Sequence, residues 1–127
     1  MAITFTKVTV INPARPKKTS TREFLVDSGA FYTVVPAEDL KALGIKPSRQ
    51  ESFLLANGET ITKPVGNAFF EYGGKIGAAP VVFGEKEVYL LGATTLEALA
   101  LILDPINRQL KPASLVLMGY PKGLREY

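Results

Sequence analysis

Apolar and polar residues alternate along most of the chain, which predicts short strands rather than long helices. The segment ITFTKVTVI, residues 3–11, alternates with the period of a half-buried strand. The segment NPARPKKTST, residues 12–21, is rich in proline and polar residues and predicts a loop. The segment REFLVDSGA, residues 22–30, predicts a short strand that ends in a turn, because Asp, Ser and Gly all favour leaving regular structure.

Two hairpins are predicted in the middle of the chain. In ESFLLANGETITKPVG, residues 51–66, two β-prone runs flank the Asn-Gly pair at 57–58, which suits a type I′ turn. In NAFFEYGGKIGAAPVVF, residues 67–83, the turn falls at the Gly-Gly pair at 73–74.

Two short helices and further strands complete the pattern. VPAEDLKALGI, residues 35–45, predicts a helix with a proline near its first position, acidic residues in its first turn and a glycine at its end. GATTLEALA, residues 92–100, predicts a second helix; KEVYLL, residues 86–91, predicts a strand, and LILDPINRQL, residues 101–110, predicts two strand pieces joined by a turn. Together these elements predict a mainly β domain, a closed or orthogonally packed barrel rather than a doubly wound sheet.

Length and hydropathy narrow the class of protein. The 127 residues, 46% of them hydrophobic, are enough for one compact domain over residues 1–127. The N-terminal segment alternates rather than running apolar, and its basic residues follow the alternating part, so we expect no signal peptide. No stretch reaches the roughly 18 apolar residues that a membrane helix needs. We therefore expect a soluble, cytoplasmic protein that does not contact a membrane.

The chain contains no cysteine and no histidine. These two absences exclude disulfides, Ser-His and Cys-His nucleophiles and the usual zinc sites. We expect no metal and no cofactor, and chemistry from carboxylates, lysine, tyrosine or hydroxyl groups. The formal net charge is +3, and the densest basic cluster lies in ARPKKTSTR, residues 14–22. A solvated loop explains that cluster and no nucleic-acid motif accompanies it, so no nucleic-acid partner is expected.

Asp27 is the only charged residue between Glu23 and Glu38, within the apolar and small-residue run FLVDSGAFYTVVP, residues 24–36. An Asp-Ser-Gly turn is by itself a common structural feature, because the Asp side chain caps nearby backbone amides and Gly tolerates positive φ. On this stretch alone, a structural turn and a catalytic loop both stay open.

Two segments together carry a family resemblance. DSGA, residues 27–30, with Thr33 beyond it, resembles the active-site loop of aspartic proteases. LLG, residues 90–92, followed by Leu96, resembles the apolar-apolar-Gly segment that supports this loop in the retroviral-type, or retropepsin-like, members. Counted from their Asp to their Gly, the segments lie 65 residues apart, which is the scale of a single retroviral protease subunit and not of a two-lobed pepsin.

The order of the predicted elements also matches that family. A strand, the Asp-Ser-Gly loop, a hairpin with an Asn-Gly tip, two strands, the apolar-apolar-Gly segment, a helix and a final strand follow one another. The resemblance covers about residues 3–110 and leaves an extension, residues 111–127. It implies a retropepsin-like fold and cleavage of peptide or protein substrates. LVLMGYPKGLREY, residues 115–127, could be an interface strand, a cover of the substrate groove or a tail.

Peptide hydrolysis without a metal or a covalent nucleophile needs two carboxyls that share one proton, one acting as base and the other as acid. The chain has three aspartates: Asp27, Asp39 and Asp104. Asp39 fits the first turn of a helix, and Asp104 precedes a proline in a turn. The missing carboxyl is therefore best supplied by Asp27 of a second copy across a two-fold axis, and the resemblance implies an obligate homodimer.

The resemblance implies roles for the neighbours of Asp27. Ser28 stands where the family has Thr or Ser, whose hydroxyl braces the partner loop. Gly29 lets the backbone approach the acid, and its amide bonds the carboxylate. Ala30 corresponds to a residue close to bound substrate, and the Thr33 hydroxyl is expected to tie down its own loop.

The resemblance also implies roles for two distant segments. Gly92 is expected to pack under the loop, where a side chain would collide. The hairpin of residues 54–62 corresponds to the family's flap, which closes over an extended peptide; an ordinary surface hairpin is the alternative. The hairpin residues expected to contact substrate are Ala56, Asn57 and Gly58.

The sequence departs from the family after the Asp-Ser-Gly-Ala segment. Retroviral members often place acidic residues there and an Arg after the later Gly, and these form an ion pair. Here the positions hold Phe31, Tyr32 and Ala93, so acid and Arg are absent together and no orphan charge is left to bury. Phe31 and Tyr32 either line an apolar substrate-binding subsite or belong to the core.

Three functions fit these residues. The leading hypothesis is a homodimeric aspartic endopeptidase of retroviral type. A peptide-binding or dimerisation module with the same fold and little catalysis is the first alternative, although pure binding has no use for two close carboxylates. A Ser-Lys hydrolase with Ser28 as nucleophile is the second, although no lysine accompanies the motif.

Overall fold

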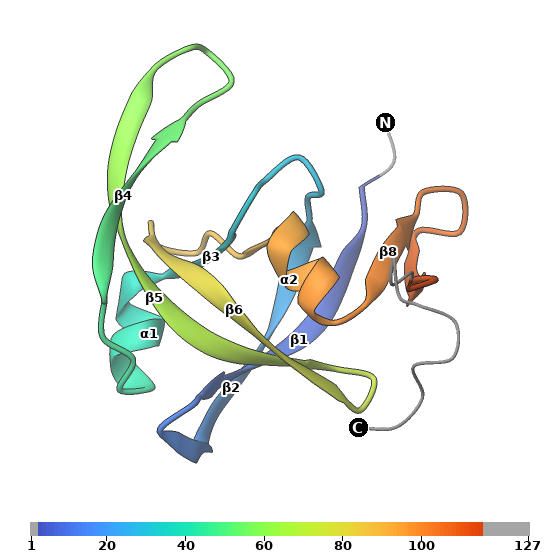
Figure 1. The fold of residues 1–127 in the computed structure, drawn as a ribbon, viewed down its shortest axis with the longest axis horizontal. Coiled ribbons are helices and arrows are strands. Elements are labelled where there is room, and N and C mark those ends of the chain that lie inside the picture. The colour runs from blue at the N-terminus through green and yellow to red at the C-terminus, as the bar shows by residue number, and fades with distance from the viewer. Residues whose placement is uncertain (1–2, 116–127) are drawn as a thin grey trace, which may run out of the picture.

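The chain folds as a ring of strands from which one hairpin projects (Figure 1). The structure is a computed structural model and describes residues 3–115. Its helices are α1 (Ala37–Ala42) and α2 (Ala93–Ala98). Its strands are β1 (Phe5–Asn12), β2 (Arg15–Val26), β3 (Thr33–Pro36), β4 (Arg49–Leu54), β5 (Thr60–Tyr72), β6 (Lys75–Gly84), β7 (Leu90–Leu91), β8 (Leu101–Asp104) and β9 (Gln109–Pro112).

Seven strands form one sheet in the order β1-β2-β7-β3-β6-β5-β4, and β1 also pairs with β5. This additional pairing closes the sheet into a ring and leaves β4 outside it. β8 and β9 form a separate two-stranded sheet. The ring-like sheet and the short helices confirm the predicted mainly β fold class, and both helices lie within the ranges predicted for them, residues 35–45 and 92–100.

The hydrophobic core lies within the ring. The alternation of β1 buries Val8 and Val10, whereas Thr9 between them is half-buried and Lys7 before them is exposed. α2 packs against β6 and adds Leu96 and Leu99 to the same core. Burying a large apolar side chain contributes roughly 1.5–3 kcal/mol, so the amphipathic strands and helices hold the ring together.

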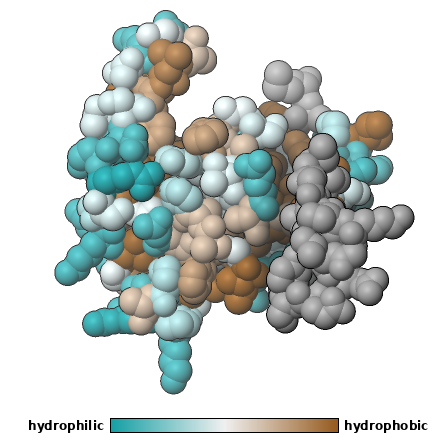
Figure 2. Space-filling model, in the orientation of Figure 1, coloured by the Kyte–Doolittle hydropathy of each residue, from teal (hydrophilic) through white to brown (hydrophobic). Residues whose placement is uncertain are grey.

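One hairpin extends beyond the ring. β4 pairs with the first part of β5 up to Val65, and from Val65 onward β5 pairs with β6. Residues 49–65 therefore stand away from the other strands, as Figure 1 shows, and we call them the projecting hairpin. Figure 2 shows apolar residues at its tip, where Leu54 is 77% exposed and Leu55 is 37% exposed.

The prediction of a loop over residues 12–21 is wrong, because β2 begins at Arg15 and pairs with β1. Most residues in the first part of β2 are exposed, so no apolar alternation marks them as a strand. The register shifts between Ile11 and Asn12, and Pro16 falls in this irregularity. A proline is tolerated there because its missing N–H removes no regular ladder bond.

The prediction of a type I′ turn at Asn57 and Gly58 is also wrong. Gly58 has a φ of +88°, whereas Asn57 keeps a negative φ. The Gly58 N–H donates to the Leu55 carbonyl at 3.0 Å, and the Asn57 side-chain oxygen accepts the Glu59 N–H at 2.9 Å. The loop is therefore longer and only its glycine is left-handed. The Gly-Gly turn at 73–74 is as predicted, with φ of +57° and +83°.

The strand predicted over residues 86–91 shortens to β7. Glu87 has a φ of +65°, and the Val88 N–H donates to the Glu85 carbonyl at 3.3 Å, so the first part of the segment is a turn. The two strand pieces and the turn predicted over residues 101–110 are confirmed by β8 and β9.

The described residues include only the beginning of the predicted extension, residues 111–127. β9 ends at Pro112, and nearly all of LVLMGYPKGLREY lies outside the described residues, so its proposed roles stay predictions. Between residues 3 and 115, no helix combines the length and the apolar character needed to cross a membrane.

Candidate active site

Asp27 begins the loop that joins β2 to β3, and we call residues 27–32 the Asp27 loop. The Asp27 N–H donates to the Leu91 carbonyl of β7 at 3.0 Å. The Gly29 N–H donates to the Asp27 carboxylate at 3.0 Å, and the Ala30 N–H donates to the Asp27 carbonyl at 3.0 Å. A Cβ at Gly29 would lie 3.2 Å from the same carboxylate oxygen, so the glycine leaves room for this bond. The loop thus orients the carboxylate through its own backbone.

The Thr33 side chain, which is fully buried, connects the end of the Asp27 loop to α2. Its hydroxyl accepts the Gly92 N–H at 3.0 Å and lies 2.5 Å from the hydroxyl of Thr95. Thr95 is also fully buried, and it is not among the site residues predicted from the sequence. The available signal was its position: a hydroxyl on the apolar face of a helix that directly follows the Leu-Leu-Gly segment. Buried hydroxyls need partners, and these two satisfy each other.

Gly92 lies against the backbone of the Asp27 loop. A Cβ at this position would be 2.6 Å from the Tyr32 carbonyl carbon and oxygen and 3.0 Å from the Ala30 oxygen. The Ala93 N–H donates to the Ala30 carbonyl at 2.8 Å, and the Thr94 N–H donates to the Phe31 carbonyl at 3.0 Å. The first amides of a helix have no partner within the helix, and here the loop supplies their acceptors.

A cavity of about 560 Å³ lies between the Asp27 loop and the projecting hairpin. Its lining is mainly apolar, as is usual for ligand sites, and Asp27 contributes to it. Among the residues predicted to contact substrate, Phe31, Tyr32 and Ala56 line the cavity. The tip residues Asn57 and Gly58 do not line it, and neither does Ser28, which is exposed.

Tyr32 joins the Asp27 loop to the projecting hairpin. Its ring packs edge-on against Phe53 of β4, with centroids 5.9 Å apart, and lies 5.1 Å from the Phe31 ring. The Arg49 guanidinium donates to the Tyr32 hydroxyl at 3.2 Å. Phe31 is 69% exposed, so the alternative that it belongs to the core is wrong. Both aromatic residues form a wall of the cavity.

Two ion pairs lie at the base of the projecting hairpin. Arg49 donates to the Glu51 carboxylate at 3.0 Å, and Lys63 of β5 donates to the carboxylate of Glu85. Lys63 and Glu85 line the cavity. The hydrogen bond and the charge of Lys63 hold the pKa of Glu85 below its ordinary value of 4.5.

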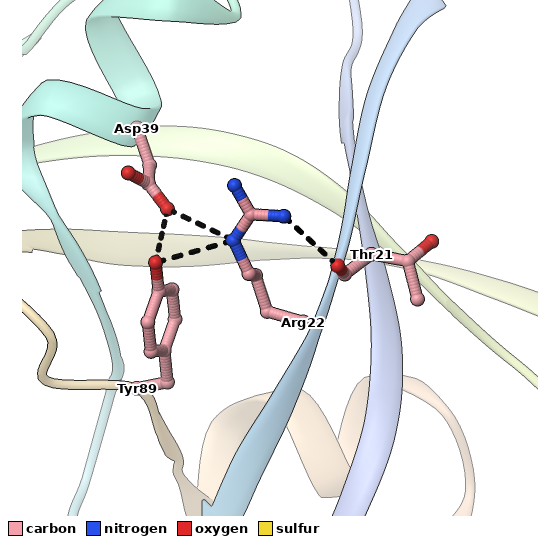
Figure 3. A network of polar contacts seen from close by, with 4 residues as sticks. All are labelled: Thr21, Arg22, Asp39 and Tyr89. Atoms are coloured by element: carbon pink, nitrogen blue, oxygen red, sulfur yellow. Dashed lines mark hydrogen bonds and ion pairs between the residues drawn. The ribbon is translucent and has the colours of Figure 1, made fainter.

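A polar network links Arg22 of β2 and Asp39 of α1 to Tyr89, which directly precedes β7 (Figure 3). The Tyr89 hydroxyl donates to the Asp39 carboxylate, and the Arg22 Nε donates to the same hydroxyl at 3.3 Å. The Tyr89 carbonyl accepts the Leu25 N–H at 3.0 Å, and its ring packs edge-on against Phe24. Burial, followed by the hydrogen bond to Asp39, raises the pKa of Tyr89 above its ordinary value of 10.0.

The other two aspartates serve local structure. Asp39 lies in the first turn of α1, as predicted, and binds the Tyr89 hydroxyl. Asp104 accepts the backbone N–H groups of Ile106 and Asn107 at 3.0 and 3.2 Å, which closes the β8–β9 turn. Within residues 3–115, no group of three or more acidic residues is arranged to hold a metal ion.

Comparison with known proteins agrees with this geometry. A family model described as aspartyl protease matches residues 9–96, which include Asp27, Gly92 and the projecting hairpin. The solution structure of the simian foamy virus (mac) protease is similar to the chain, with a TM-score of 0.51 and 18% sequence identity over 72% of this chain and 92% of that one. At this identity the likeness shows the fold alone. No curated protein matches the chain. The family match spans well over half of the sequence, and the chain therefore belongs to the aspartyl protease family, with a retropepsin-like fold.

Proposed function

We propose that the chain is a homodimeric aspartic endopeptidase in which two Asp27 carboxyls, one from each subunit, activate a water molecule for attack on a peptide bond. One observation carries the proposal. Among the three aspartates, only Asp27 lines the cavity, and its own loop holds it there without a second aspartate beside it. A site that needs two carboxyls is completed by a symmetric second copy.

The chemistry follows from the sharing of one proton by the two carboxyls. Like charges about 3 Å apart raise the pKa of one partner, so one carboxyl stays protonated while the other is ionised. The ionised carboxyl takes a proton from water, and the protonated one donates to the peptide carbonyl oxygen. The projecting hairpin would close over the extended substrate and exclude water from this step. Ser28 would brace the loop of the partner.

The Ser-Lys alternative has little structural support. Ser28 does not line the cavity, although Lys63 does, and the Lys63 ammonium is bonded to Glu85. A nucleophilic serine needs its base within hydrogen-bond reach. The binding-module alternative differs from the proposed function only in turnover, so an activity measurement decides between them.

The test is cleavage of a diverse peptide pool by wild type and Asp27→Asn between about pH 4 and 7, a range in which the second carboxyl of such pairs titrates. The oligomer mass is recorded on the same samples. Because general acid–base catalysis is lost, we expect turnover to fall by at least about a thousandfold while the dimer persists. Asp104→Asn is the matched control, since Asp104 lies outside the cavity, and it should still cut.

Three outcomes would contradict the proposal. A dimeric Asp27→Asn protein that still cuts would exclude the two-carboxyl mechanism. A dimeric wild type that never cuts would favour the binding module. An active monomer would exclude the shared site.

A further inference from the structure

The base of the projecting hairpin places one lysine beside the cavity that contains Asp27. In chain order, β5 makes its first pair with β6 at Val65↔Val82, and Lys63 lies two residues before Val65, on the projecting hairpin. Glu85 is the first residue after β6. Lys63 and Glu85 therefore meet where the hairpin leaves the ring, and both line the cavity.

The two partners of this ion pair differ in exposure. The Lys63 side chain is 28% exposed, whereas the Glu85 side chain is 75% exposed. The Lys63 side chain is therefore partly buried, whereas Glu85 contacts its ammonium from the solvent-exposed side. Separating the pair would return Glu85 to water at little cost, but would leave the lysine short of a partner.

No other acid of the described residues competes for Lys63. Glu51 lies directly opposite Lys63 in the β4–β5 pairing, but its carboxylate accepts from Arg49 at 3.0 Å. In the part of the chain that the structure describes, the ion-pair partner of Lys63 is Glu85. The Lys63 ammonium has three hydrogen-bond donors, so it is able to bind a further carboxylate.

The walls around Lys63 strengthen this interaction. The cavity lining includes aliphatic residues: Ile61 on the same strand, Val82 on the neighbouring strand β6, and Val88. An ion pair in such surroundings is screened less than one in open water. A carboxylate that arrives through the cavity therefore gains more from Lys63 than the exposed Glu85 does.

We propose that Lys63 selects substrates that carry an acidic side chain at one defined position, and that the substrate carboxylate takes the place of Glu85 on the Lys63 ammonium. The inference rests on the proposed function, because it names a feature of the peptide that the same cavity accepts. It adds a charged specificity element to a cavity whose lining is mainly apolar.

The test compares matched peptides that differ only by Glu or Gln at the position where the pool of cut sites is enriched in acidic residues. For wild type we expect a higher kcat/KM for the Glu peptide. In Lys63→Met the ratio of the two kcat/KM values should fall about tenfold, the loss of one hydrogen bond between charged groups. Lys86→Met is the matched control, since Lys86 does not line this cavity, and its ratio should equal that of wild type.

Glu85→Gln provides an independent measurement. Glu85→Gln removes the carboxylate that competes with the substrate for Lys63. The ratio of kcat/KM for the Glu peptide to kcat/KM for the Gln peptide should therefore rise by about threefold, because an exposed ion pair contributes little more than this to binding. An unchanged or lower ratio in Glu85→Gln would overturn the inference, as would the absence of acidic enrichment in wild type or an equal ratio in wild type and Lys63→Met.

A binding experiment separates this inference from the proposed function. The same peptide pool is passed over immobilised Asp27→Asn protein and over the Asp27→Asn/Lys63→Met double variant. Acidic enrichment among the retained peptides for the first protein alone supports the role of Lys63, whether or not wild type cleaves. Equal enrichment on both proteins overturns it. Failure of wild type to cut would contradict only the proposed function.

Discussion

The Asp27 loop and the projecting hairpin enclose the same cavity, but they are held in place by different kinds of contact. The loop is fixed by backbone hydrogen bonds: its amides and carbonyls bond to Leu91, Ala93 and Thr94, and the buried Thr33 hydroxyl accepts from Gly92. The hairpin is fixed by side chains at its base, and its tip is exposed, with Leu54 77% exposed. Several backbone hydrogen bonds to neighbouring elements leave one geometry, whereas exposed side-chain contacts break and re-form easily.

This difference suits the Asp27 loop and the projecting hairpin to the two tasks that the proposed function gives them. A carboxylate that must share a proton has to be held within a few tenths of an ångström of its working position. A cover over a peptide has to open and close. The contrast predicts that equivalent substitutions cost much more stability in the loop and its support than in the hairpin.

The largest expected effect is at Gly92. Gly92→Ala would place a Cβ 2.6 Å from the Tyr32 backbone, and backbone is not able to move aside cheaply. We expect a loss of about 3 kcal/mol in the free energy of unfolding, measured by urea at fixed protein concentration, together with loss of turnover. The matched control is Gly58→Ala in the hairpin tip, which has no atom within 4 Å and meets only the strain of its φ of +88°, about 1–2 kcal/mol. Equal losses would refute the contrast.

A smaller effect on stability is expected at Tyr89, which directly precedes β7. Tyr89→Phe removes the hydroxyl that bonds Asp39 and Arg22, and should lower the free energy of unfolding by about 1 kcal/mol at neutral pH. The raised pKa of Tyr89 means that folding favours the neutral phenol, so its stabilisation is complete below its ordinary value of 10.0 and is lost as the pH rises through the higher folded value.

The measurement for Tyr89 is urea unfolding of wild type and variant from neutral pH to about pH 11, beyond the ordinary range of tyrosine. The gap between the two proteins should narrow as the pH passes 10, because only wild type loses the contribution of Tyr89. Tyrosines elsewhere titrate equally in both proteins and cancel in the difference. A gap that stays constant over the whole range would show that the Tyr89 hydroxyl does not carry the effect.

The smallest effect on stability is expected at the contact between the two regions. Tyr32→Phe keeps the ring against Phe53 and removes only the acceptor of Arg49, so the free energy of unfolding should change by less than about 0.5 kcal/mol. Amide hydrogen exchange in β4 should nevertheless become faster, while exchange in β1 stays the same, because the hairpin loses a contact at its base. Unchanged exchange in β4 would show that this contact does not restrain the hairpin.

The sequence predicts the fold well where one physical signal dominates. Alternation identifies β1, and the glycines at 73–74 identify their turn, because two left-handed residues in a row favour glycine. The first part of β2 has no such signal, since it is exposed, and it becomes a strand only by pairing with β1. The Asn57 turn is missed because the Asn side chain bonds the Glu59 amide and changes the backbone angles required.

In the candidate site too, residues with a clear local signal in the sequence are predicted, and residues whose role depends on distant contacts are missed. Asp27 stands out because a single charge in an apolar run is visible in the sequence. Thr95 does not stand out, because its role depends on a hydroxyl 62 residues away. The pairing of Lys63 with Glu85 is equally hidden in the sequence, since only the folded chain brings the second strand of the projecting hairpin beside the end of β6. Contacts between distant residues need the topology, which residue types alone do not give.

The hydrogen bond between Thr33 and Thr95 also limits how early during synthesis the support of the Asp27 loop is able to form. The two hydroxyls are 62 residues apart in the chain, so they are joined only after most of the domain exists. At a synthesis rate of about 5–20 residues per second, about 3–12 seconds pass between the addition of the first threonine and that of the second. During this interval Asp27 is already present, but Gly92 and α2, which hold its loop through hydrogen bonds, are not yet complete. A growing chain therefore gains the support of its Asp27 loop late, once β7 and α2 have left the ribosome.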